Sequence, residues 1–236
     1  MNFQSVILNQ NKLSDVKIRE AIAHGIDRQY IVDELLAGSG EIINGPYTSL
    51  HPYYKADVKS YDYNPELSKS LFEEAGWNFS DTLELVVPKG NQTREMVATI
   101  IVENLRQIGV TVKISTFDFP TVMQKAREGD YDLLLMGYTF TIDPDYTSLY
   151  GSNEPYNFMK YESEENDKLL LAGKNEADPA KRKVIYNQLQ DLWQKDLPLI
   201  TLYSDPDFFV VSNKLTTGGP KVIGALANLQ DWDLAE

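Results

Sequence analysis

The chain has 236 residues, no cysteine and 42% hydrophobic residues, and its 35 Asp and Glu against 22 Lys and Arg give a formal net charge of −13. This length can bury a substantial core, and 14 Tyr, 9 Phe and 3 Trp argue against a disordered chain. The acidic balance opposes nucleic-acid binding, which depends on Lys and Arg to neutralise phosphates. The missing cysteine excludes disulfides, thiolate metal sites and cysteine nucleophiles.

No stretch of the sequence approaches the roughly 20 apolar residues that a membrane span needs. We therefore expect no direct insertion of this chain into a membrane. The first eight residues contain neither a basic segment nor a small-residue cleavage site, so they do not read as an export signal. These features predict either a cytosolic protein or a piece of something larger.

The first periodic segment, residues 16–36, has apolar side chains at roughly helical spacing and predicts a helix. Ser14 is expected to cap its N-terminus, because a serine hydroxyl can accept a bond from a free N–H of the first turn. Gly38 is expected to end it. Residues 41–63 are rich in Tyr, Pro, Asn and Gly, which predicts an irregular loop.

Helices and strands alternate along the rest of the chain. The next helix is expected to begin at Asn64-Pro65, since Asn is a good cap and Pro suits the first helical position. Strands are expected over 83–87, 110–114, 131–138, 198–203 and 208–211, and further helices over 93–108, 119–127, around 169–171 and from 179. This order predicts an α/β fold around an open sheet, in a single compact domain.

The search for catalytic residues finds little. His24 lies within the first predicted helix and His51 in a Pro-flanked loop, and neither stands at metal-ligand spacing to the other or to a carboxylate pair. A structural or incidental role explains each of them better. The chain also lacks a Walker loop, a nucleophile elbow and a dinucleotide-binding glycine turn. We expect no enzyme, no metal site and no cofactor.

A recognition surface is the stronger expectation. Asp143 and Asp145 follow the buried strand predicted over 131–138. Asp-Pro-Asp is ordinary turn chemistry, yet ligands of open α/β sheets bind outside the carboxyl ends of strands. Seven aromatic residues between 138 and 161 alternate with Thr, Ser and Asn. Such a mixture suits recognition, and it equally suits a lid over the core.

Six further segments follow one another in a fixed order. They are Asp15 to Arg28 (D-V-K-I-R-E-A-I-A-H-G-I-D-R); Gly45-Pro46 with Tyr61 to Pro65 and Leu71 to Trp77; Ile108-Gly109-Val110; Gly129 to Asp132; Gly137-Tyr138 with Asp143-Pro144-Asp145; and Asp178, Arg182, Tyr186 and Gln190 with Asp196 to Pro198. Together they cover about residues 13–212. This order resembles the family-5 extracellular solute-binding proteins, the oligopeptide- and dipeptide-binding components of bacterial ABC importers.

The resemblance implies a periplasmic-binding-protein-like (type II) lobe with an open, mostly parallel sheet and helices on both faces. Members of the family have two lobes that close over a solute. The whole chain, 1–236, is then expected to be the second, C-terminal lobe, with residues 222–236 returning toward a missing first lobe. The implied partners are a peptide ligand, that first lobe and an ABC permease. The implied location is the cell surface, through a lipid anchor, or the periplasm.

The resemblance also implies ligand contacts after Gly137. The expected contacts are Tyr138, Thr139, Phe140, Thr141, Asp143 and Asp145, with Tyr146 and Asn157 as weaker candidates. Many members carry an acidic residue in this loop that pairs with the α-ammonium of the peptide. Here that place is occupied by Thr141 or lost to a one-residue gap. A neutral ligand, a longer peptide held mostly by its main chain, or another solute therefore stays open.

Two alternatives to an importer component remain. A peptide or pheromone sensor would use the same fold, and the sequence does not separate it from a transport protein. A hydrolase acting through Asp143 and Asp145 is less favoured. Side chains two residues apart on a turn stiffened by proline are poorly placed to flank a scissile bond.

Overall fold

The computed structural model describes residues 2–139, 143–205, 209–221 and 226–235. The chain divides into two compact units, residues 1–205 and residues 206–236. The prediction of one compact domain therefore applies to residues 1–205, and the C-terminal residues form a unit of their own.

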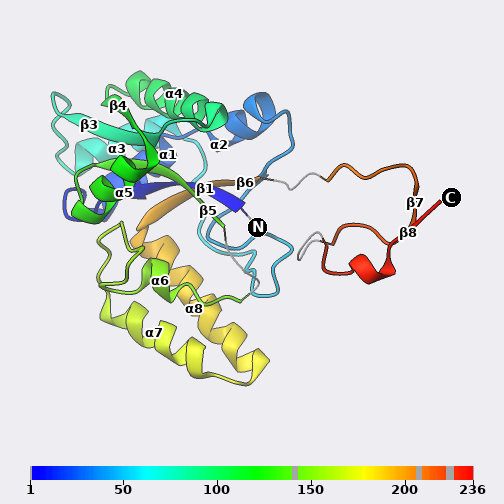
Figure 1. The fold of residues 1–236 in the computed structure, drawn as a ribbon. Coiled ribbons are helices and arrows are strands. Elements are labelled where there is room, and N and C mark those ends of the chain that lie inside the picture. Colours follow the sequence, from blue (N-terminus) through cyan, green and yellow to red (C-terminus); the bar gives the residue numbers. More distant parts are fainter. Residues whose placement is uncertain (1, 140–142, 206–208, 222–225, 236) are drawn as a thin grey trace. The chain divides into compact units, whose positions relative to one another are not determined.

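The first unit is built on an open six-stranded sheet with the order β2-β6-β1-β5-β3-β4 (Figure 1). β3 is parallel to β4 and β5, β1 is antiparallel to β5 and β6, and β2 is antiparallel to β6. In the described part of the chain, β3, β4, β5 and β6 thus share one direction, which makes the sheet mostly parallel as predicted. Its strands are β1 (Asn2–Leu8), β2 (Glu41–Ile42), β3 (Thr82–Pro88), β4 (Thr111–Phe117), β5 (Leu133–Thr139) and β6 (Leu199–Asp205).

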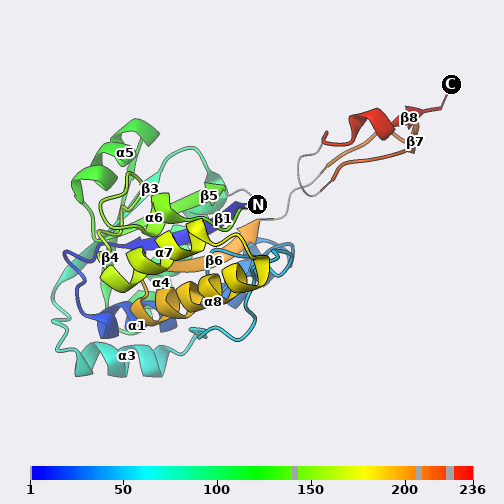
Figure 2. The same cartoon turned by 90° about the horizontal axis from the view of Figure 1, so that it is seen from below.

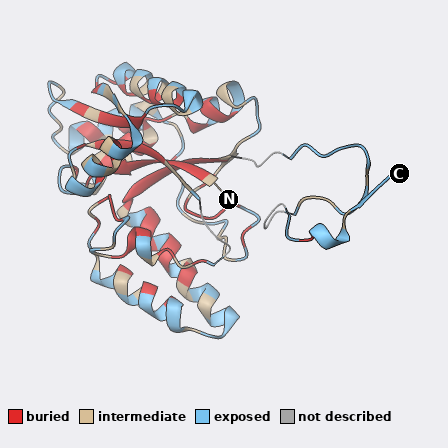
Figure 3. Cartoon of the chain, viewed as in Figure 1, coloured by how far each residue is buried: buried red, intermediate tan, exposed pale blue. Residues whose placement is uncertain are grey.

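Helices cover both faces of this sheet, also as predicted (Figures 1 and 2). Alternate residues of each strand point to opposite faces, so Val6 joins one core with α1, α3 and α4, while Ile7 joins the other with α5 to α8. Figure 3 shows that the strands and the inner sides of the helices are the buried parts. The helices are α1 (Val16–His24), α2 (Arg28–Tyr30), the π-helix η1 (Ile31–Leu35), α3 (Pro65–Glu74), α4 (Gln92–Gln107), α5 (Phe119–Glu128), α6 (Thr147–Tyr150), α7 (Glu164–Asn175) and α8 (Pro179–Asp196).

Local capping chemistry accounts for several boundaries. Asn64 caps α3 by accepting a hydrogen bond from the Leu67 amide at 3.0 Å, with Pro65 in the first turn as predicted. Gly129 ends α5 in the left-handed conformation, with φ of 74°. A residue with a Cβ is strained there, which explains why the helix ends at a glycine.

The helix predicted over residues 16–36 is wrong in its length and in its cap. Asp15, not Ser14, caps α1, by accepting a hydrogen bond from the Lys17 amide at 2.8 Å. The helix ends at His24. Asp27 then caps the next helix, α2, by accepting a hydrogen bond from the Tyr30 amide. The hydrophobic spacing continues across this break, so periodicity alone merged separate helices into one.

Two strand assignments also differ from the sequence reading. β1 was not predicted, because Gln4 and Ser5 interrupt its apolar run, yet it lies between β5 and β6 in the sheet. The strand predicted over 208–211 is not present in its described part: residues 209–211 are exposed and lie outside any strand, and Phe208 lies outside the described residues.

Two buried arginines explain much of the segment from Asp15 to Arg28. Burial lowers the pKa of both Arg19 and Arg28, and both guanidinium groups bind carbonyl oxygens from distant segments. Arg19 donates to the carbonyls of Leu13, Ser14, Asp196 and Leu197, and Arg28 donates to those of Ile43, Tyr61 and Thr201 and to the Asn44 side chain. These two motif residues therefore have a structural role, because each connects segments that are distant in the sequence.

The second unit is a small hairpin-like structure. β7 (Leu215–Thr217) pairs antiparallel with β8 (Asp233–Leu234), and a 3-10 turn, η2 (Leu229–Asp231), precedes β8. Trp232 donates a hydrogen bond from Nε1 to Asn228 Oδ1 at 3.3 Å. The predicted return of residues 222–236 toward a first lobe stays a prediction.

Candidate functional site

The candidate site lies where β1 begins and β5 and β6 end. Asn2 is paired with Thr139 of β5 and with Asp205 of β6, so the three strand ends lie side by side at one edge of the sheet (Figure 1). Open α/β sheets bind ligands outside the carboxyl ends of their strands. The predicted contact loop leaves the sheet at this edge.

The first two predicted contacts fall on opposite faces of the sheet. The Thr139 hydroxyl donates to Asn2 Oδ1 at 2.6 Å on the face that α4 covers. Tyr138 points to the other face, where its ring lies 5.8 Å from that of Phe3. Burial raises the pKa of Tyr138 above its ordinary value. The next two predicted contacts, Phe140 and Thr141, lie outside the described residues.

Asp143 and Asp145 form a turn. Asp143 Oδ1 accepts hydrogen bonds from the Asp145 amide at 2.9 Å and from Arg182 Nη2 at 3.1 Å. Asp145 Oδ1 accepts one from the Thr147 amide at 2.9 Å, at the start of α6. The carboxylates thus order the backbone, as the turn explanation predicts, and Asp143 keeps 57% of its side chain exposed.

Arg182 connects this turn to two other segments. Its Nε donates to the Gly173 carbonyl at 2.9 Å, near the end of α7. Its guanidinium also lies over the Tyr53 and Tyr186 rings, 5.8 and 5.4 Å from their centres. One side chain of α8 therefore fixes the turn after β5, the end of α7 and the loop before α3.

The weaker candidates Tyr146 and Asn157 lie in the interior of this chain, and their role as ligand contacts stays a prediction. Tyr146 is 3% exposed, and its hydroxyl donates to the Pro46 carbonyl at 3.1 Å. Asn157 is 7% exposed, and its side-chain amide bonds to the backbone of Gly151 and Tyr161. Both side chains use their polar groups within the chain.

Most of the aromatic residues that follow Tyr138 pack the core. Tyr146, Tyr150, Phe158 and Tyr161 are each at most 3% exposed. Tyr150 stacks on Trp193 of α8 with ring centres 4.1 Å apart. The sequence left recognition and packing equally open for this segment, and the structure favours packing for these four rings.

An arginine that the sequence analysis missed lies at the same edge. Arg94 donates from Nε to Gln4 Oε1 at 3.1 Å, and Gln4 Nε2 donates to Asp205 Oδ2 at 3.1 Å. Within the described part of the chain, the two terminal nitrogens of Arg94 donate no hydrogen bond. Gly137 makes room for this group, because a Cβ there would lie 3.0 Å from Arg94 Nη2 and 2.7 Å from Gln4 Nε2.

The chemistry of this arginine suits an anion. Burial lowers the pKa of Arg94, with Tyr203 and Asp205 acting in the opposite direction, and a guanidinium remains charged at neutral pH. Its planar fork of N–H groups matches a carboxylate. The sequence contained one signal for this role of Arg94: it is a basic residue in the first turn of a helix, where the helix dipole favours acidic residues.

Within the described ranges, no group of three or more His, Asp or Glu side chains could hold a metal ion. Those ranges also contain no helix that is long and apolar enough to cross a membrane. An open α/β sheet with polar and charged side chains gathered at its carboxyl edge is the arrangement of a ligand-binding domain.

The chain belongs to the bacterial extracellular solute-binding proteins, family 5, whose middle region matches residues 1–160. It is 27% identical over 243 residues to the oligopeptide-binding protein AppA of Bacillus subtilis (strain 168), covering 94% of this chain and 44% of AppA. It is 24% identical over 226 residues to heme-binding protein A of Haemophilus influenzae, covering 91% of this chain and 41% of that protein. The predicted family is confirmed, and both relatives are named as binding proteins.

A solved structure extends this comparison to the fold. The structure of Bacillus subtilis AppA in complex with a nonapeptide matches with a TM-score of 0.88 and 25% identity, covering 100% of this chain and 51% of that chain. The periplasmic-binding-protein type II fold is thereby confirmed. The chain spans less than half the length of the curated relatives named above.

Proposed function

We propose that this chain is the C-terminal lobe of a two-lobed extracellular receptor that binds oligopeptides and delivers them to an ABC permease. The observation that carries the proposal is the match of the whole chain to half of a peptide-bound relative, with a TM-score of 0.88. On this proposal the chain is a binding component and catalyses no reaction. The full-length protein is held at the cell surface by a lipid anchor or lies in the periplasm.

The strand order supports a cleft at the sheet edge. β1 and β6 are neighbours and antiparallel, so residue 2 and residue 205 lie side by side next to the end of β5. A first lobe joined through these two strands would face the loop that follows Thr139. Closure of two such lobes over a solute is the usual movement of hinged binding proteins.

Within this cleft we propose two kinds of contact. Tyr138, Thr139, Phe140, Thr141, Asp143 and Asp145 are proposed to surround the main chain of the peptide. Arg94 is proposed to bind an anionic group, such as the carboxylate at the end of a peptide, because a half-buried guanidinium with open N–H groups pairs well with carboxylates. Tyr146 and Asn157, which are buried in this chain, stay weaker candidates for this contact.

Native mass spectrometry of the full-length protein, purified from its own host, tests the solute class. We expect a co-purified mass that fragments as a peptide. A heme or another non-peptide solute in its place would overturn the peptide assignment while leaving the receptor architecture intact.

Titration calorimetry with residues 1–236 alone tests the proposal that this chain is half of a receptor. A single lobe provides one wall of the cleft, so we expect feeble binding of peptides that the full-length protein binds well. If the isolated chain bound these peptides with micromolar affinity, the proposal that it provides only one wall of the cleft would be contradicted.

A further inference from the structure

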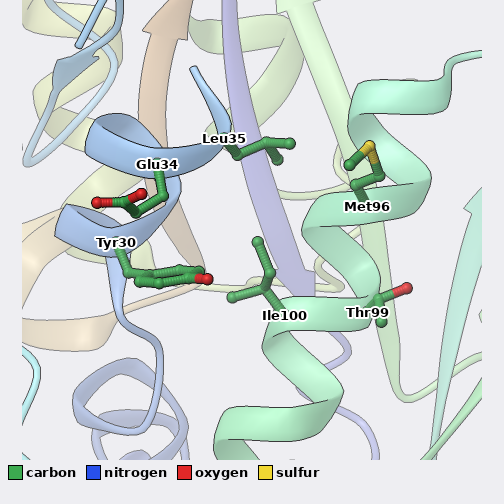
Figure 4. Close-up of a pocket in the computed structure, with 6 residues that line it drawn as sticks. All are labelled: Tyr30, Glu34, Leu35, Met96, Thr99 and Ile100. Atoms are coloured by element: carbon green, nitrogen blue, oxygen red, sulfur yellow. The ribbon is translucent and has the colours of Figure 1, made fainter. Parts of the chain in front are cut away.

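A groove crosses the outer surface of the helical layer formed by α2, η1 and α4. Two adjoining depressions of about 450 Å³ each share the lining residues Tyr30, Thr99 and Ile100. Figure 4 shows Tyr30, Glu34 and Leu35 on one wall and Met96, Thr99 and Ile100 of α4 on the other. The second depression continues along α4 to Gln107.

Exposed apolar side chains line one end of this groove. Tyr30 is 51% exposed and Met96 is 53% exposed, and Leu35 and Ile100 are partly covered between them. The π-helix contributes to this wall. Its hydrogen bonds join residues five apart, so Tyr30 and Leu35 lie about one turn from each other and line the same side.

The charged side chains that line the groove are all acidic. Its lining includes Asp27, Glu34 and Glu103 and no lysine or arginine. Glu103 is paired with Arg106 at 2.7 Å. In the described part of the chain, no basic side chain forms an ion pair with Asp27 or Glu34. An occupant would therefore need apolar side chains for one end and positive charge for the rim.

The length of the groove indicates the shape of that occupant. It follows one stripe of α4 from Met96 to Gln107, and at 1.5 Å per residue this is about 16 Å, or three helical turns. Helix-in-groove recognition uses apolar anchors at intervals of three and four residues. Met96, Ile100, Glu103 and Gln107 repeat at this interval on α4, so a partner helix could lie along them.

We propose that this groove is a docking surface for a cationic amphipathic helix of a partner protein. Its apolar side chains would pack between Tyr30 and Met96, and its lysines or arginines would face Asp27 and Glu34. The groove lies in the helical layer opposite the aromatic core beneath Asp143. This inference does not depend on the proposed peptide ligand. If one of the two proposals is contradicted, the other still stands.

The test uses the chain of residues 1–236 and a synthetic 14-residue helical peptide with leucines on one face and lysines on the other. A matched peptide carries glutamate in place of lysine. We expect saturable binding of the lysine peptide by fluorescence anisotropy, with amide chemical-shift changes concentrated in residues 27–35 and 96–107. We expect no binding of the glutamate peptide.

Two matched substitutions locate the binding. Met96→Lys removes an exposed apolar anchor and should weaken binding of the lysine peptide by about tenfold or more. Leu171→Lys adds the same charge at a 63% exposed leucine of α7 and should leave the affinity unchanged. Glu34→Gln should also weaken binding, while Glu162→Gln, at another exposed acid, should not.

Several results would overturn the proposal. If Met96→Lys and Leu171→Lys weaken binding of the lysine peptide equally, the peptide binds the acidic surface as a whole and not this groove. Equal binding of both peptides would contradict the charge argument, and absence of saturation up to about 1 mM would contradict docking. Self-association of the chain that Met96→Lys abolishes would show that a second copy occupies the groove instead.

Discussion

Arg182 donates a hydrogen bond to Asp143 at 3.1 Å and so ties the turn that follows β5 to helix α8. The same guanidinium bonds to the Gly173 carbonyl and lies over two tyrosine rings, so its position is fixed independently of Asp143. The arginine is 21% exposed and the aspartate 57% exposed. This pair connects the turn in the proposed contact loop to the core.

The energetic coupling of this pair can be measured by a double-mutant cycle. Arg182→Ala, Asp143→Asn and the double variant should show a coupling of about 0.2–1 kcal/mol in the free energy of urea unfolding, the range of partly exposed ion pairs. Lys183→Ala is the matched control, because Lys183 bonds to the Pro52 carbonyl instead. Strict additivity of Arg182→Ala and Asp143→Asn would contradict the coupling.

Arg94 provides a test of the proposed ligand site in the full-length receptor. If its terminal nitrogens bind the carboxylate of a peptide, Arg94→Gln should weaken binding by about 10- to 150-fold, since bonds to charged groups contribute about 1.5–3 kcal/mol. The comparison is made by calorimetry with a peptide that the receptor binds. Arg106→Gln, on the exposed side of the same helix, should have no effect.

A second readout separates carboxylate binding from a structural role. The unmodified receptor should prefer the free acid of a peptide over its C-terminal amide, and Arg94→Gln should abolish that preference. If Arg94→Gln lowers the affinity for both forms equally, Arg94 acts through the fold and does not bind the carboxylate.

The sequence predicted those features that depend on near neighbours. The cap at Asn64, the glycine stop at Gly129 and the buried strand β5 all follow from residues a few positions apart, and the structure confirms them. The order of the motifs along the chain indicated the protein family. These signals were sufficient for the fold and for the edge of the sheet where a ligand is expected.

The missed features depend on contacts between distant segments. β1 is a strand because it fits between β5 and β6, and its own polar residues at Gln4 and Ser5 conceal this in the sequence. Arg94 reaches the candidate site only because Gly137, 43 positions later, leaves room for its guanidinium. The burial of Tyr146 and Asn157 could not be read from the sequence, because it depends on packing against distant segments.

Arg19 is expected to be important for stability because it bonds to the carbonyls at the end of α8 as well as to those before α1. Arg19→Leu should lower the free energy of unfolding by about 2–4 kcal/mol, through unsatisfied carbonyls and the lost cation at a helix C-terminus. Urea denaturation followed by circular dichroism measures this change. Lys17→Ala, on the exposed side of α1, should cost far less, and a similar cost would contradict the assigned role.

The N-cap of α5 makes one contribution to stability depend on pH. Asp118 accepts a hydrogen bond from the Thr121 amide at 2.9 Å, and this bond, with help from the Thr121 hydroxyl, lowers the pKa of Asp118 below 3.8. A carboxylate with a lower pKa in the folded state stabilises the protein above its unfolded pKa. That stabilisation is lost as the pH falls through the folded pKa.

Asp118→Asn keeps a capping side chain but removes the charge, so it should lower the melting temperature at pH 7. The difference from the unmodified chain should shrink as the pH falls below about 4, because Asp118 then becomes neutral as well. Asn64→Ala removes a cap that does not titrate, and its effect on the melting temperature should stay constant over the same pH range. An Asp118→Asn difference that persists unchanged at the lowest pH would show that the charge of Asp118 does not stabilise α5.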